Sequence, residues 1–263
     1  MADKITALIL GDIVGQPGCR ALFIGLKSLI RKYNADFVIV NGENAAGGFG
    51  ITPDLADQIF AIGVDVITSG NHIWQKKEIY KYLDSTEKLI RPANYPGDVP
   101  GNGFCVITKK DFRMCVINLQ GRVEMYDLDS PFDTASSIIR TQSDAADGII
   151  VDFHAESTAE KEALALYLDG KVNAVVGTHT HIQTADERIL PEGTAFITDL
   201  GMTGPTGSVI GVDPEISIRR SLTQMPLKME VLEMPGVIRG VAVDISKNGK
   251  TQSISRIAEY PGF

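Results

Sequence analysis

The sequence predicts an α/β fold with a mostly parallel sheet, and two observations on its 263 residues support this. Short apolar runs rich in valine and isoleucine alternate with segments of helical periodicity, which is the pattern of βαβ units. The composition is that of a globular protein, since 44% of the residues are hydrophobic and 22% are charged. These values exclude a disordered chain, a collagen-like repeat and a disulfide-stapled miniprotein.

The first half of the chain contains three expected strands, and a polar turn follows each of them. These strands cover residues 5–10, 37–40 and 64–68. Apolar residues repeat with a 3.6 period over 20–33, which predicts a helix after the first strand. Thr52 and Pro53 supply an N-cap and a first-turn proline for a second helix. This alternation favours parallel pairing of the three strands.

The second half begins with an expected β-hairpin and then returns to alternating strands and helices. The hairpin comprises residues 103–108 and 113–119, and further strands are expected over 148–153, 173–177, 228–231 and 237–243. Helices are expected to begin at Ser130-Pro131, at the capping box of residues 157–160 and at Asp213-Pro214. The sequence contains no repeat or linker, so we expect residues 1–263 to form a single domain.

The net charge of −8 narrows the range of partners. An acidic chain has no overall attraction to nucleic acid or anionic lipid, so neither double-stranded DNA nor a membrane is expected as a partner. The three cysteines, Cys19, Cys105 and Cys115, cannot all pair and are expected to be small buried residues. Their reduced state and the absence of a signal sequence predict a cytoplasmic protein. The oligomeric state stays open, a homo-oligomer included.

Polar residues stand where five of the expected strands end. They are Asp12, Glu43, Asn71, His154 and the pair His179 and His181. Because ligands of open α/β sheets bind outside the carboxyl ends of the strands, these side chains are expected to converge. Mixed oxygen and nitrogen ligands suit manganese, iron or zinc better than calcium, and their number suits two adjacent ions. The sequence therefore predicts a metal centre.

The spacing of His179 and His181 is the most specific part of this pattern. Side chains at alternate positions of extended chain point the same way, so the two imidazoles are expected to hold a cation together. Taken singly, Asp12 fits a helix cap equally well, and a solvated loop is the commoner role for Glu43 and a structural one for His154. Their location at one sheet edge favours the metal site.

The order of these residues resembles that of the calcineurin-like metallophosphoesterases, and in detail that of the bacterial YmdB-like subgroup. The resemblance extends from Gly11 to Gly211, and the segments that carry it are GDIVG, NGENAAGG, GNHIW, RPANYPG, INLQGR, DFHAE, VVGTHTHIQTADERILP and ITDLGMTGP. It implies a four-layer α/β/β/α sandwich with a centre of two divalent or trivalent metal ions.

The resemblance also implies a role for each candidate residue. Asp12, Glu43 and His181 would hold one ion, and Glu43 (as a bridge), Asn71, His154 and His179 would hold the other. His72 would protonate the leaving oxygen. The implied activity is a phosphodiesterase that hydrolyses cyclic nucleotides, 2′,3′-cyclic and also 3′,5′-cyclic monophosphates, by attack of a metal-bridging hydroxide. Its partner is thus a small-molecule phosphodiester.

The sequence departs from most of that superfamily at two positions. Val14 stands where most members have histidine, and Glu43 replaces a bridging aspartate. Asn44 is the candidate for the vacated place, and its amide oxygen would favour iron or manganese over zinc. Asn44 could instead donate to the phosphate or hold its own loop in place.

Other motifs give weaker predictions. The glycine spacing after residue 10 is not G-x-G-x-x-G, which argues against NAD or FAD. Residues 45–50 lack the lysine of a P-loop and are expected to form a mobile loop where phosphate approaches the backbone. Arg91 and Arg122 fit substrate contacts or structural ion pairs, and Trp74 fits base stacking or, more commonly, core packing.

Three other functions compete with the phosphodiesterase. A phosphomonoesterase would use the same site, and substrate charge and pocket shape would decide between the two. An amidohydrolase-type enzyme is disfavoured because its His-x-His pair normally follows the first barrel strand, whereas here it lies at 179–181. A non-catalytic metal- or nucleotide-binding regulator is disfavoured by the complete set of histidines.

Overall fold

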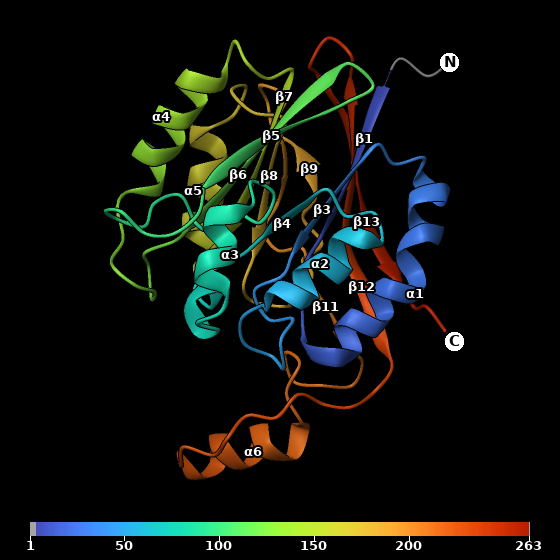
Figure 1. The fold of residues 1–263 in the computed structure, drawn as a ribbon, viewed down its shortest axis with the longest axis vertical. Coiled ribbons are helices and arrows are strands. Elements are labelled where there is room, and N and C mark those ends of the chain that lie inside the picture. Colours follow the sequence, from blue (N-terminus) through green and yellow to red (C-terminus); the bar gives the residue numbers. More distant parts are fainter. Residues whose placement is uncertain (1–3, 263) are drawn as a thin grey trace.

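The computed structural model describes residues 4–262 and consists of two β-sheets packed face to face between two layers of helices (Figure 1). Helices α1 (Gly15–Tyr33) and α2 (Pro53–Ala61) pack on the first sheet. Helices α4 (Pro131–Gln142) and α5 (Thr158–Tyr167) pack on the second. A third apolar cluster fills the space between the sheets. The predicted four-layer α/β/β/α sandwich is confirmed.

The first sheet has seven strands in the order β2-β11-β12-β1-β3-β4, with β13 beside β12. Its strands are β1 (Lys4–Leu10), β2 (Asp12–Ile13), β3 (Phe37–Asn41), β4 (Val66–Thr68), β11 (Met202–Pro205), β12 (Gly236–Ser246) and β13 (Thr251–Glu259). The strands β1, β3 and β4 run parallel, as the sequence predicted, whereas β12 runs antiparallel to β1. The carboxyl ends of β1, β3 and β4 therefore share one edge of the molecule.

The second sheet has six strands in the order β5-β6-β7-β8-β10-β9. They are β5 (Phe104–Lys109), β6 (Phe112–Gln120), β7 (Gly148–His154), β8 (Ala174–Thr178), β9 (Arg188–Ile189) and β10 (Ala195–Ile197). The expected hairpin is β5 and β6, and the strands from β6 to β10 across the centre run parallel. His154 at the end of β7 pairs in register with Thr178 at the end of β8.

The helix starts predicted from capping residues are confirmed. Thr52 accepts a hydrogen bond from the backbone N–H of Leu55, and Ser157 accepts one from Glu160. Asp213 caps helix α6 (Pro214–Thr223) in the same way. Two short elements, η1 (Ile73–Gln75) and α3 (Ile79–Ser85), follow the turn after β4 and were not expected.

Two expectations near the C-terminus were wrong. Residues 228–231 form no strand, because the segment leaves the body of the protein and only Val231 makes a β-bridge, with Val212. Strand β13 was missed because it lies at a sheet edge and only one of its residues is buried, so its residues form no apolar run.

The three cysteines are all buried and free, as expected. Between residues 4 and 262, no helix is long and apolar enough to span a bilayer.

Candidate metal centre

All eight predicted site residues lie at the edge where the parallel strands of both sheets end. Asp12 begins β2, Glu43 and Asn44 follow β3, and Asn71 and His72 follow β4 in the first sheet. From the second sheet, His154 ends β7, and His179 and His181 follow β8. The packing of the two sheets brings these strand ends together, because β3 and β4 face β7 and β8 across the central core.

Three of these side chains surround the imidazole of His154. Its Nε2 atom lies 2.9 Å from Asn71 Oδ1, 3.3 Å from Glu43 Oε2 and 3.0 Å from His179 Nδ1. One atom each from Glu43, His154 and His179 lies within 4.8 Å of the other two, which is the spacing that metal ligands need. These four residues are the set that the sequence predicted for one of the two ions.

In the other predicted set, Asn44 links Glu43 to His181, whereas Asp12 contacts His179 and His154. The Asn44 amide nitrogen lies 2.8 Å from Glu43 Oε1 and 3.1 Å from His181 Nε2. Asp12 Oδ2 accepts a hydrogen bond of 3.3 Å from the backbone N–H of His179, whereas Asp12 Oδ1 is buried without a hydrogen-bond partner. An unpaired buried carboxylate oxygen is costly, so this arrangement fits a cation beside Asp12.

The protonation states of the cluster also fit a bound cation. Burial, with Glu43 second, raises the pKa of Asp12 well above its usual range. Burial would also raise the pKa of Glu43, but His154 and His72 outweigh it and lower that pKa. Burial lowers the pKa of His154 and of His179, so both imidazoles are neutral near pH 7 and have a lone pair for a metal.

The backbone around the two histidines after β8 differs from the expectation. His179 and His181 have φ angles of 97° and 65°, so this segment is left-handed at both positions instead of extended. His179 turns toward His154, and His181 turns toward Asn44 and the carbonyl of Ile210. The two imidazoles thus have different neighbours, and strained backbone of this kind is typical of functional sites.

A buried ion pair holds that strained segment. Asp199 accepts hydrogen bonds from the backbone N–H and the hydroxyl of Thr180, at 3.1 and 2.8 Å. The ammonium of Lys161 lies 2.8 Å from the same carboxylate, and both side chains are fully buried. The sequence analysis assigned no role to either residue, although Asp199 lies in the segment ITDLGMTGP.

Asp152 is a second residue that the sequence analysis missed. Its buried carboxylate lies beneath His154 and accepts hydrogen bonds from Asn41, Thr68 and Thr178. Burial raises its pKa to about 6. A single acidic residue inside the apolar run 148–153 was the signal that could have identified it, since an unpaired carboxylate there is unfavourable.

His72 faces a pocket of about 370 Å³ beside this cluster. Its Nδ1 atom lies 2.7 Å from Asn44 Oδ1, and its backbone N–H donates to Glu43 Oε2 at 3.0 Å. The edge of the Phe49 ring packs against the imidazole, with 5.1 Å between the ring centroids. Asn44 and Glu43 therefore fix the Nδ1 side of the ring, and the Nε2 side is available for proton transfer.

The pocket is polar at one end and apolar at the other. One end is formed by cluster residues, and Ile210, Val212, Met229 and Val231 form an apolar wall opposite. The described residues that line it include Glu43, Glu156 and Glu230 but neither lysine nor arginine. An anionic ligand here would find no cationic side chain in the lining to neutralise it.

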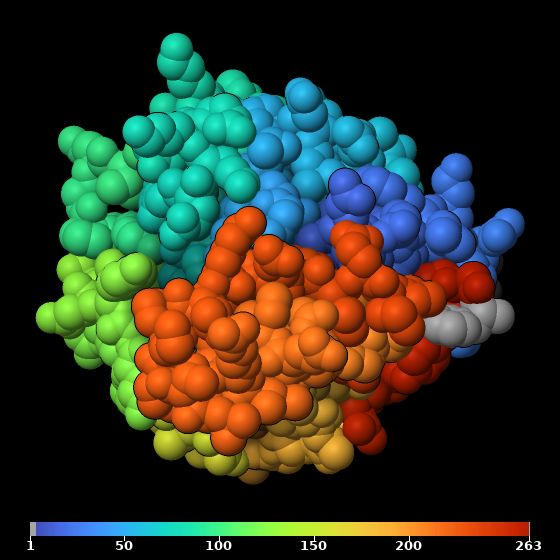
Figure 2. All heavy atoms as spheres, turned by 90° about the horizontal axis from the view of Figure 1, so that it is seen from below, coloured from blue at the N-terminus to red at the C-terminus, as the bar shows by residue number. Residues whose placement is uncertain are grey.

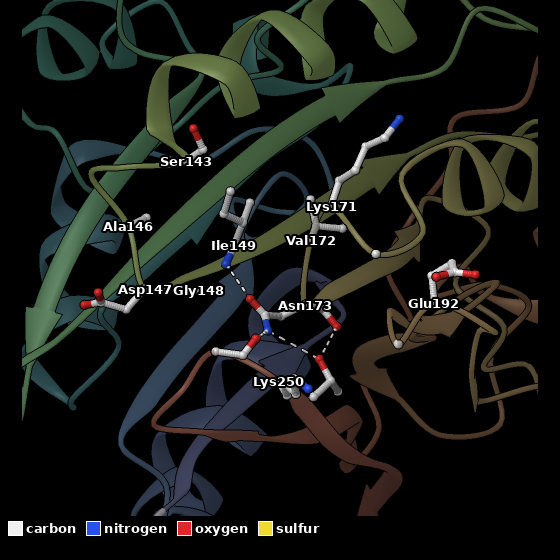
Figure 3. Close-up of a pocket in the computed structure, with 14 residues that line it drawn as sticks. Ser143, Ala146, Asp147, Gly148, Ile149, Lys171, Val172, Asn173, Glu192 and Lys250 are labelled. Atoms are coloured by element: carbon white, nitrogen blue, oxygen red, sulfur yellow. Dashed lines mark hydrogen bonds between the residues drawn. The ribbon is translucent and has the colours of Figure 1, made fainter.

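A second hollow, of about 470 Å³, lies at the opposite ends of β7 and β8 (Figure 3). Its central residue, Asn173, accepts a 2.8 Å hydrogen bond from the backbone N–H of Ile149 and donates one to the carbonyl of Gly249. Lys171 extends away from the hollow and donates to the carbonyl of Tyr167. Its polar groups hold the second sheet against the β12–β13 hairpin, and none of the predicted site residues lines it.

Most residues of the weaker sequence motifs make contacts that hold the fold together or lie away from the pocket. The Arg91 guanidinium donates to the carbonyls of Pro92 and Pro100, and Arg122 is exposed, away from the residues that line the pocket. Trp74 packs edge to face against Tyr80 and Tyr95. In the glycine-rich loop, Gly48 and Phe49 line the pocket, which agrees with its expected position beside the site.

Known proteins resemble this chain over almost its whole length. A family model described as "YmdB-like protein" matches residues 8–257. A 2′,3′-cyclic-nucleotide 2′-phosphodiesterase of Bacillus subtilis (strain 168) is 45% identical over 251 residues, which is 95% of each chain. A crystal structure described as a novel phosphatase of Mycoplasma pneumoniae matches with a TM-score of 0.92 and 35% sequence identity. The match covers 100% of this chain and 96% of the Mycoplasma chain.

A crystal structure of a hypothetical protein from Thermus thermophilus has a TM-score of 0.90 and 38% identity, over 98% of this chain and 100% of that one. The fold, the order of the strand-end residues and these similarities agree. The chain belongs to the YmdB-like protein family.

Proposed function

We propose that this protein is a metal-dependent phosphodiesterase that hydrolyses 2′,3′-cyclic nucleotides, with 3′,5′-cyclic nucleotides as further substrates. The name of the Bacillus subtilis relative supports the first substrate class. Cleavage would break the bond between phosphorus and the ribose 2′ oxygen. Water would supply a hydroxyl to phosphorus and a proton to the leaving oxygen, which gives a nucleoside 3′-phosphate.

The charge of the pocket is the observation that carries this proposal. Three glutamates, Glu43, Glu156 and Glu230, line it together with an apolar wall, and its described lining includes no lysine or arginine. A phosphodiester has one negative charge, whereas a phosphomonoester has close to two near neutral pH. The pocket therefore favours the diester, whose single charge is easier to neutralise by bound cations alone.

Two ions, iron or manganese in preference to zinc, would fit the donor groups of the cluster. Asp12, Glu43, Asn44 and His181 would hold one ion, and Glu43, Asn71, His154 and His179 the other. Bound there, the ions would lower the pKa of water and neutralise charge on the phosphoryl group. The unpartnered Asp12 oxygen and the neutral imidazoles support this assignment, because both would gain from a cation.

Asn44 is proposed to be a ligand of the ion that would lose one imidazole because Val14 stands where a histidine is expected. The backbone of Asn44 makes a β-bridge with Val14. The side chain of Asn44 therefore begins next to position 14, where a histidine is expected in most of the wider superfamily. Its amide also lies between His72 and His181. Asn44→Asp should keep metal binding, and Asn44→Leu should lose one ion per chain, as elemental analysis would measure.

His72 is proposed to protonate the leaving oxygen. The Asn44 amide oxygen accepts from Nδ1, and the Glu43 carboxylate lies 3.1 Å from the same atom. These contacts keep a proton on Nδ1, and a proton on Nε2 would pass to the alkoxide. Expelling a ribose alkoxide without such a proton is the difficult part of the reaction.

Hydrolysis of matched substrates tests the proposal. With Mn²⁺ present, the protein should hydrolyse 2′,3′-cyclic AMP and bis(p-nitrophenyl) phosphate faster than p-nitrophenyl phosphate. A preference for the monoester would contradict the proposal and favour a phosphomonoesterase, the second candidate, which the description of the Mycoplasma pneumoniae structure as a phosphatase supports. Failure to hydrolyse any of them with bound metal would favour a non-catalytic regulator.

A variant of Glu43 tests the bridging assignment separately. Glu43→Gln keeps the shape of the side chain but removes the charge that two ions would share. Metal content should fall and hydrolysis with it. Full activity at unchanged metal content would show that Glu43 does not bridge the ions.

A further inference from the structure

The chain between β11 and β12 forms an arm, residues 206–235, that projects from the body of the protein (Figure 1). It contains α6, which has no buried residue. Seen from below in Figure 2, the orange spheres of this segment lie over the middle of the face, between the N-terminal half and the yellow-green second half. The arm thus extends across the edge where the strand ends meet.

The base of the arm is fitted closely to the candidate metal centre. Val231 packs on two glycines, and a Cβ atom would lie 2.9 Å from its side chain at Gly15 and 2.8 Å at Gly48. Nδ1 of His181 lies 2.8 Å from the carbonyl oxygen of Ile210. Glycine at positions 15 and 48 therefore lets the arm approach the site. The contact between Ile210 and His181 fixes the distance of the arm from the cluster.

Apolar side chains of the arm face the cluster residues across the pocket. Ile210 and Met229, which line it, are 47% and 38% exposed overall, and Val212 and Val231 line it beside them. Phe49, on the body, lines the same pocket next to His72. Exposed apolar groups this close to a polar site are typical of a surface that contacts a ligand.

The chemistry of the wall identifies the part of a ligand that fits it. When a phosphoryl group lies at the cluster, the organic part of the ester faces the wall. The side chains of Ile210, Val212, Met229 and Val231 offer no hydroxyl or amide that could read the edge of a base. Methionine and branched aliphatic side chains contact the flat face of an aromatic ring well, whichever base it belongs to.

We propose that the arm is the nucleobase-binding element of the site and that it holds the base by apolar contact without selecting its identity. This inference rests on the proposed function, since it concerns the same substrate. Glu230 is the one ionisable side chain that the arm adds to the lining. It is mostly exposed and lies 3.7 Å from Lys228, so it is expected to discriminate little between bases.

Two substrates that differ only in the base separate this role from catalysis. Ile210→Ala and Met229→Ala should each raise the KM for 2′,3′-cyclic AMP, and the double variant should raise it about tenfold or more, because several methylene contacts are lost. Glycerol 1,2-cyclic phosphate has the same reacting ring but no base. The kcat and KM for this substrate should stay unchanged in the two single variants and in the double variant.

Matched controls lie on the same arm. Ile218 and Met234 are as exposed as the tested residues but do not line the pocket, so Ile218→Ala and Met234→Ala should leave all constants unchanged. In the wild-type protein, the kcat/KM values for the 2′,3′-cyclic forms of AMP, GMP, CMP and UMP should lie within about tenfold of one another.

Three outcomes would overturn the inference. They are an unchanged KM for 2′,3′-cyclic AMP in the double variant, an equal rise in the KM for glycerol 1,2-cyclic phosphate, and a hundredfold or so preference for one base. If the wild-type protein hydrolysed neither cyclic phosphate when loaded with Mn²⁺, the proposed function itself would fail. Binding of adenosine 3′-phosphate to the wild-type protein and the double variant, measured by calorimetry, would then test the arm separately and should be weaker in the variant.

Discussion

The Thr178 hydroxyl fixes the tautomer of His154. It lies 3.0 Å from Nδ1 of the imidazole and 2.7 Å from the Asp152 carboxylate. The ionised carboxylate can only accept, so Thr178 donates to Asp152 and accepts from the Nδ1–H of His154. The proton is thereby kept on Nδ1, and the lone pair of Nε2 faces Glu43 and Asn71. Partners of this kind orient metal-ligating histidines.

Replacing Thr178 by Val should weaken metal binding without unfolding the protein. The change keeps the branched shape and removes the hydroxyl, so the tautomer of His154 is no longer determined. The affinity for Mn²⁺ should fall about 10- to 100-fold. The long-range ¹⁵N NMR spectrum of the imidazole should show a mixture of tautomers in the metal-free variant, and Thr178→Ser should restore both properties.

Thr194 offers a matched control for that experiment. It is also a buried threonine of the second half of the chain, and its hydroxyl donates to the carbonyl of Val172, far from the cluster. Thr194→Val should lower stability to a similar degree and leave Mn²⁺ affinity unchanged. Equal losses of affinity in the two variants would show that Thr178 acts through general stability alone.

Asp12 is expected to destabilise the metal-free protein at neutral pH. Burial and the neighbouring Glu43 raise its pKa, so the folded state holds this proton to higher pH than the unfolded state. A protonated Asp12 side chain favours the folded state. This contribution to stability is fully present below about pH 4, the pKa of aspartate in the unfolded chain, and is lost as the pH rises through the higher pKa of Asp12 in the folded state. Asp12→Asn should therefore stabilise the metal-free protein.

Urea unfolding in the presence of EDTA measures this effect. The variant should be more stable than the wild type at about pH 8, and the two should converge near pH 4. Excess Mn²⁺ should reverse the order, because only the wild-type folded state gains free energy from full metal binding. A difference that is independent of pH would contradict the raised pKa.

Local patterns in the sequence predicted the α/β class of the fold and six residues of the cluster, whereas the four layers, His72 and Asn44 came from the resemblance to the metallophosphoesterases. Buried parallel strands are continuous apolar runs, and the residue after each run stands at the sheet edge, so Asp12 and His154 could be located without knowing any contact. The resemblance to the metallophosphoesterases added the grouping around Glu43. In the structure, Glu43, His154 and His179 lie together and Asn44 contacts His181, and the division of the residues between two ions stays a prediction.

The supporting residues could not be predicted in this way because their roles depend on contacts across the sandwich. Asp152 interacts with Asn41 and Thr68 of the other sheet, 111 and 84 residues away in sequence. Asp199, which accepts from Thr180 next to the left-handed His179, pairs with Lys161, and that lysine lies on a helix and looks like any solvated lysine in the sequence. The apolar arm was missed because its exposed residues follow no regular period.

The ion pair between Lys161 and Asp199 should contribute strongly to stability. Both side chains are fully buried, and Lys161→Met leaves the Asp199 carboxylate without its cation. We expect the free energy of unfolding to fall by about 3–5 kcal/mol, as measured by urea denaturation. Lys32→Met removes the partner of Glu259 in an exposed pair and should change stability far less.

The same variant reports on the backbone of the metal ligands. If Asp199 holds Thr180 in place, the Lys161→Met protein should bind Mn²⁺ more weakly even under conditions in which it is fully folded. The double variant Lys161→Met/Asp199→Leu removes the unpaired charge as well, and it should recover part of the stability but not the affinity. Recovery of both would show that the pair has no positioning role.

The proposed role of His72 predicts that its loss depends on the leaving group. Its Nε2 proton is needed for a ribose alkoxide, whereas p-nitrophenolate leaves without protonation. His72→Gln should therefore lower kcat for 2′,3′-cyclic AMP by about 10²- to 10⁴-fold and lower kcat for bis(p-nitrophenyl) phosphate far less. Metal content should stay unchanged, since His72 contacts the cluster through Asn44 and Glu43. Equal losses for both substrates would instead indicate that His72 acts by holding Glu43, because a displaced bridging carboxylate would impair every ester alike.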